Sequence, residues 1–83
     1  MQQGFNENIE HKGDVYHVQT EDGGIKKPVV TTIVFRGGAI IASRKTNYSD
    51  VIKFGRLDMV VKELMQEQHD RAVMDLKRGK FDK

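Results

Sequence analysis

Two glycine-containing breaks, each between segments typical of β-strands, constrain the fold of this chain more than any other feature. They are Gly13-Asp14 and Gly37-Gly38. The segments beside them, in chain order, are residues 5–12, 15–20, 29–36 and 39–46. Two-residue connections with glycine are typical of β-hairpins, because glycine readily adopts the positive φ that such turns need. The first half of the sequence therefore predicts two hairpins and four antiparallel strands.

The second half of the sequence predicts one long amphipathic helix over about residues 56–78. Its apolar residues recur at the spacing of three and four that makes one stripe: Leu57, Val60, Val61, Leu64 and Met65. Gly79 follows this segment, as expected at a helix C-terminus. The stripe thins over residues 66–71, so the helix either bends or overhangs the sheet. A shorter helical turn is expected within residues 47–55.

We therefore predict one α+β domain over residues 1–83, a four-stranded antiparallel sheet with one long C-terminal helix packed on one face. The chain has 83 residues and no cysteine, so its stability depends on this packing and on any self-association. We expect the helix to cover the face that carries Ile33, Phe35 and Ile40. The predicted core comprises Ile9, Tyr16, Val18, Ile33, Phe35, Ile40, Leu57, Val61 and Leu64.

Both faces of the second predicted hairpin are apolar, and a single helix can cover only one of them. A second copy of the chain is the simplest cover for the remaining strip, and another protein is the alternative. The leading hypothesis is therefore a non-catalytic protein-interaction or regulatory module that associates with itself as a homodimer.

The polar face of the first predicted hairpin suggests a different hypothesis, a small-ligand site. A Gly13-Asp14 turn would place Glu10 opposite His17, within reach of a charge-assisted hydrogen bond. The residues predicted to bind a ligand or partner are Asn8, Glu10, His17, Gln19, Glu21 and Asp22. No nucleophile lies nearby in sequence, and no glycine-rich phosphate motif occurs. We therefore expect no catalytic residue, no metal and no cofactor.

Charge is unevenly distributed along the chain, although the net charge is only +2. Residues 1–25 carry five acids and one base, whereas residues 26–56 carry seven bases and one acid. The second hypothesis is therefore a nucleic-acid-binding protein that uses the basic second hairpin and the segment after it. Its predicted contacts are Arg36, Arg44, Lys45, Lys53 and Arg56.

The sequence does not predict contact with a membrane. Its longest apolar cluster, residues 29–35, is far shorter than the roughly 18 residues of a spanning helix. The first five residues lack the basic and apolar regions of a secretory signal. We therefore expect a cytoplasmic protein.

Several short motifs resemble a family of small uncharacterised bacterial proteins and domains. They are Phe5-Asn6-x-Asn8-Ile9, Gly13 and His17-Val18-Gln19-Thr20-Glu21-Asp22-x-Gly24, with further similarity over residues 40–48 and 63–69. The family has no established activity, so the resemblance implies no mechanism. Its members resemble this chain as stand-alone proteins and as the first part of longer ones, which suits a binding or regulatory module. The resemblance also implies a specific role for the polar segment 17–22, at a ligand site or in holding the long loop.

Overall fold

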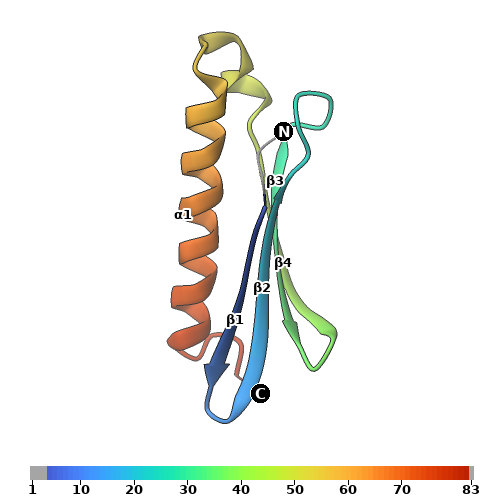
Figure 1. Cartoon of the computed structure of the whole chain (residues 1–83), viewed down its shortest axis with the longest axis vertical. Helices are drawn as coiled ribbons and strands as arrows, with labels where there is room; N and C mark the ends of the chain where they lie inside the picture. Colours follow the sequence, from blue (N-terminus) through green and yellow to red (C-terminus); the bar gives the residue numbers. More distant parts are fainter. Residues whose placement is uncertain (1–3, 83) are drawn as a thin grey trace.

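Four antiparallel strands and one long helix form the structure, a computed structural model that describes residues 4–82 apart from the side chains of residues 53 and 54. The strands lie side by side in chain order, and the helix packs against one face of the sheet (Figure 1). The predicted α+β fold is therefore confirmed. The elements are β1 (Phe5–His11), β2 (Asp14–Asp22), β3 (Val29–Arg36), β4 (Ala39–Asn47), the 3-10 helix η1 (Ser49–Phe54) and α1 (Leu57–Lys77).

The turn between β1 and β2 is Lys12-Gly13, one residue earlier than predicted. Both of its residues have positive φ, 52° and 85°, as a type I′ turn requires. The earlier turn shifts the register by two residues, so Asn8 pairs with His17, and the predicted pairing of Glu10 with His17 is wrong. Because side chains alternate with a period of two, each face of the hairpin keeps its predicted residues.

The turn between β3 and β4 is Gly37-Gly38, as predicted, with φ values of 58° and 82°. A β-bulge interrupts the register beyond it, since Val34 pairs with Ala42 whereas Phe35 pairs with Ile40. The additional residue on β4 changes which of its side chains share a face with β3. Ala42 therefore lies on the helix side with Val34, and Ile40 lies on the other side with Phe35.

The helix covers the face of the sheet opposite to the predicted one. Val18 and Val34 lie under α1 and are at most 1% exposed, whereas Ile40 is 61% exposed. Ile33 and Phe35 are half-buried on the face that α1 does not cover. The register between β2 and β3 explains the difference. β2 has only one apolar face, and the pairing of Val18 with Val34 joins that face to the second apolar face of β3.

Both ends of α1 contact the sheet, so the helix does not overhang it. Val61 and Met65, near its start, lie in a cluster with side chains of β3 and of the segment before η1. Ala72 and Leu76, near its end, lie in a second cluster with side chains of β1, β2 and β3. Of the predicted core, the structure buries Ile9, Tyr16, Val18 and Val61 and packs Leu57 and Leu64 at the margin.

The residues after α1 fold back onto the first hairpin. Lys12 Nζ and His11 Nε2 lie 2.7 and 2.9 Å from the two carboxylate oxygens of Asp82. The hydrogen bond from Lys12 holds the pKa of the Asp82 carboxyl below its usual value. Phe81 packs beside the cluster at the end of the helix. This segment therefore closes one end of the core.

Replacing Met65 by alanine should destabilise the protein far more than the same change at Met59 on the same helix. Met65 is fully buried, whereas Met59 is 53% exposed. A cavity at Met65 should lower the free energy of unfolding by about 2–5 kcal/mol, and Met59→Ala should change it by less than about 0.5 kcal/mol. Urea denaturation followed by circular dichroism measures both variants. Equal effects would contradict the assignment of the buried stripe.

Candidate functional site on the open face of the sheet

Figure 1 shows α1 on one side of the sheet only, and we call the other side the open face. Its side chains come from alternate positions of all four strands, because successive residues of a strand point to opposite faces. The cross-strand pairs arrange them in rows. From the turn end upward these rows are Asn8–His17–Phe35–Ile40, Asn6–Gln19–Ile33–Ser43 and Glu21–Thr31–Lys45.

An apolar strip, defined as Ile33, Phe35 and Ile40, lies on the half of the open face that β3 and β4 form. Ile40 is mostly exposed and the other two are half-buried. A shallow depression of about 540 Å³ lies beside the strip, lined in part by Val15, His17 and Phe35. Apolar surface bordered by polar side chains is typical of a binding site. The strip is therefore the centre of the candidate site.

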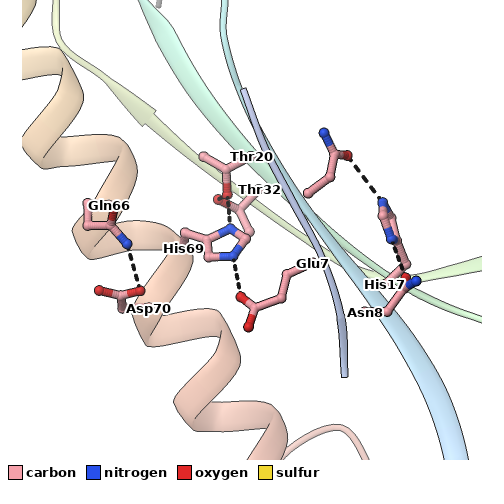
Figure 2. Close-up of polar contacts among 9 residues, drawn as sticks. Glu7, Asn8, His17, Thr20, Thr32, Gln66, His69 and Asp70 are labelled. Atoms are coloured by element: carbon pink, nitrogen blue, oxygen red, sulfur yellow. Dashed lines mark hydrogen bonds and ion pairs between the residues drawn. The ribbon is translucent and has the colours of Figure 1, made fainter. Parts of the chain in front are cut away.

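His17 stands beside this strip and is held from both sides of its ring. Its Nδ1 atom lies 2.8 Å from Asn8 Oδ1, and its Nε2 atom lies 3.2 Å from Asn6 Oδ1 (Figure 2). The ring also contacts Phe35, with 5.9 Å between the ring centroids. The two asparagines take the place that sequence analysis gave to Glu10. They fix the orientation of the imidazole on the open face.

Three of the four remaining residues predicted for a ligand site lie on the open face. Gln19 lies in the row next to His17, and Glu10 lies opposite Val15 near the turn. Glu21 is exposed at the far end of the open face, where its carboxylate lies over Gly4 in the space that a side chain there would fill. The structure therefore gathers most of the predicted polar residues on one face, although not in one cluster.

Asp22, the last predicted ligand residue, lies away from this face and is buried. Its Oδ1 atom accepts hydrogen bonds from the Tyr48 hydroxyl at 2.6 Å and from the Gly24 backbone N–H at 3.0 Å. Burial, reinforced by the bond to Asp22, raises the pKa of Tyr48 to about 12. Asp22 therefore connects the long loop before β3 to the segment before η1.

The basic residues predicted to contact nucleic acid do not share one surface. Arg44 Nη2 forms an ion pair with Asp75 Oδ2 at 2.6 Å on the helix side, whereas the next residue, Lys45, lies on the open face. Arg36 donates to the backbone carbonyl of Phe81 at 3.3 Å. Arg56 is exposed just before α1, and the Lys53 side chain lies outside the described residues. Two of the five cations are thus engaged within the molecule.

A buried polar network on the helix side was not anticipated from the sequence. His69 is 4% exposed, and its Nδ1 atom lies 2.9 Å from Thr20 Oγ1 (Figure 2). Its Nε2 atom lies 3.0 Å from Glu7 Oε1, and Thr20 Oγ1 lies 2.7 Å from Thr32 Oγ1. Gln68 Nε2 donates to Thr32 Oγ1 at 3.0 Å. The network therefore joins α1 to β1, β2 and β3.

One arrangement of protons satisfies every member of this network. Gln68 donates to Thr32, Thr32 to Thr20, and Thr20 to Nδ1 of His69, which leaves the His69 proton on Nε2 to bond Glu7. A carboxylate, an imidazole and a hydroxyl in series also make up a nucleophilic triad. Here, however, the hydroxyl is fully buried and already bonded to a second threonine. The network therefore stabilises the fold and offers no nucleophile to a substrate.

The helical spacing could have identified His69 in advance. It lies four residues after Met65 and three before Ala72, so it continues the buried stripe where the apolar residues stop. From the sequence, this gap is compatible with a bend of the helix or with an overhang beyond the sheet. In the structure the polar side chain of His69 fills the gap, because Thr20 and Thr32 stand opposite it.

Comparison of the chain with protein-family models, curated proteins and solved structures gave no match. Within residues 4–82, no group of three or more histidine, aspartate or glutamate side chains is placed to hold a metal ion. No helix in the same part of the chain is long and apolar enough to cross a membrane.

Replacing Thr20 by valine should lower the free energy of unfolding by about 1–3 kcal/mol, because it leaves buried polar atoms of His69 and Thr32 without their shared partner. Thr20→Ser keeps the hydroxyl and should restore most of this loss. Urea denaturation at neutral pH measures both variants. If Thr20→Val is as stable as the original protein, the hydroxyl chain does not contribute to stability.

Alkaline titration should detect the buried phenol of Tyr48. Its pKa is raised to about 12 from 10.0, so the folded state holds this proton more tightly than the unfolded state. The resulting stability is complete below about pH 10 and is lost as the pH rises toward 12. In a Tyr16→Phe background, Tyr48 is the only tyrosine, and absorbance at the tyrosinate band reports it directly. A midpoint near 10 in the folded protein would contradict the bond to Asp22.

Proposed function

We propose that this protein is a non-catalytic interaction module whose open face binds a second copy of the chain. The apolar strip of Ile33, Phe35 and Ile40 carries the proposal, because it lies on β3 and β4 of the face that α1 leaves uncovered. The surrounding side chains are mainly polar, as at the rim of a protein interface. An association of this kind is consistent with the small core of an 83-residue chain without cysteine.

The size of the open face suits a dimer of moderate affinity. Four strands spaced about 4.8 Å apart, with eight residues of about 3.3 Å each, make a face of roughly 500 Å². Two such faces in contact bury on the order of 1,000 Å², which is near the lower limit for a specific interface. We therefore expect an equilibrium between monomer and dimer that depends on protein concentration.

Face-to-face packing is favoured over pairing of the sheet edges. The edge strand β4 contains the bulge and the charged residues Arg44 and Lys45. The other edge strand, β1, carries Glu7 and Glu10. Charges and bulges on edge strands oppose the addition of a further strand. Two of the three residues of the apolar strip, Ile33 and Phe35, lie on the inner strand β3, where only a facing layer can cover them.

A cytoplasmic location belongs to the same proposal. Small domains of oxidising compartments commonly depend on disulfides, and this chain has no cysteine. A reducing compartment is therefore the environment that its composition suits.

Light scattering across a concentration series should show a dimer, and Ile40→Ser should weaken it roughly thirtyfold, because each copy loses about 1 kcal/mol of apolar burial. Ile40 is 61% exposed, so the variant should still fold. Ile25→Ser is the matched control, since Ile25 is 66% exposed in the loop on the helix side.

Three results would contradict the proposal. One is a monomer at every concentration, and another is equal weakening by the two isoleucine variants. The third is a monomer that binds single-stranded nucleic acid with an affinity that falls steeply as salt rises, which would favour the second hypothesis.

A further inference from the structure

We propose that the two copies pack about a two-fold axis parallel to the strands, so that Lys45 of each copy pairs with Glu21 of the other. This inference rests on the proposed function, because it specifies how the second copy sits on the open face. Glu21 and Lys45 are both exposed on that face and stand in one row, separated by Thr31 on β3. Within one copy, the two charges therefore lie on strands that are not neighbours.

The position of the Glu21 carboxylate is the first observation that supports this arrangement. Glu21 belongs to β2, but its carboxylate lies over Gly4, at the end of β1. Because Gly4 has no side chain, this corner of the open face is low and carries a negative charge. At the opposite corner of the same row, Lys45 of β4 carries a positive charge. The open face is thus acidic at one side and basic at the other.

A two-fold axis parallel to the strands brings these two corners together. It reverses the strand order of the second copy, so that β4 of one copy lies over β1 of the other. Each row of one copy then faces the same row of the other copy. Lys45 then lies over Gly4 of the second copy, where the Glu21 carboxylate stands. Packed sheets are about 10 Å apart, a distance that lysine and glutamate side chains span together. The symmetry forms the pair twice.

The same axis also determines which side chains meet in the middle of the face. It places β2 over β3, so that His17 of one copy faces Phe35 of the other in the row that they already share. Ile33 of one copy likewise faces Gln19 of the other, in the row that these two residues share. Ile33 and Phe35 of both copies therefore lie in the central part of the interface, and the charged pairs lie at the two rims. This distribution is typical of protein interfaces.

The other face-to-face arrangement, with an axis perpendicular to the strands, leaves Lys45 without an acidic partner. In that case β4 lies over β4, and β4 contains no aspartate or glutamate. When the two apolar strips overlap, Lys45 then faces the end of the second copy that carries Ile40. Covering an unpaired ammonium group with apolar surface is unfavourable. Charge therefore selects the parallel axis.

Charge reversal tests the arrangement. Glu21→Lys and Lys45→Glu should each weaken the dimer about tenfold, because each creates two like-charged contacts. An equimolar mixture of the two variants should form a heterodimer with an affinity within about threefold of the original, because both of its contacts join opposite charges. The mixture distinguishes a pair between copies from a pair within one chain. The weakening should also diminish at high salt.

Glu63→Lys and Lys62→Glu are the matched controls, because both residues are exposed on α1, away from the open face. Neither should change the dimer, and circular dichroism confirms that all variants fold. If the original protein dimerises but the reversals at Glu21 and Lys45 have no effect, or their mixture stays as weak as each alone, the axis is wrong and the proposed function stands. If the original protein does not dimerise, both inferences fail.

Discussion

The hydrogen bond between His69 and Thr20, which is itself bonded to Thr32, constrains how the helix lies on the sheet. An imidazole buried against an apolar face would be costly, so His69 is tolerated where the Thr20 hydroxyl donates to its Nδ1 atom and the Glu7 carboxylate accepts from its Nε2 atom. Apolar packing alone would allow the helix to slide or rotate on a sheet rich in valine and isoleucine. The polar network favours the position that aligns His69 with Thr20 and Glu7, and one apolar cluster lies on either side of it.

The face that remains uncovered is a consequence of this contact. Thr20 and Thr32 share a face with Val18, Val30 and Val34, so the helix that binds them covers that side of the sheet. The opposite face of β3 is also apolar, but no helix remains to cover it. The same register that satisfies His69 therefore leaves the Ile33 and Phe35 side uncovered by the helix.

Local chemistry made several elements predictable. The glycines of the two turns, the apolar spacing of the helix and Gly79 at its end each specify a conformation over a few residues, and the corresponding elements are present. The first turn was misplaced by one residue, because Lys12 adopts a positive φ that is uncommon outside glycine. The identity of the covered face was also mistaken, since both sides of β3 carry apolar residues and composition does not distinguish them.

The sequence by itself determined that the chain forms two hairpins followed by one long helix, because turns and periodicity are local properties. Only the tertiary structure decided which side of the sheet is buried and which polar residues act together. That choice depends on the register between β2 and β3, on the bulge in β4 and on a histidine 49 residues away from its threonine partner. These contacts join distant segments, and a hydrogen bond between buried groups has no counterpart in the pattern of neighbouring residues.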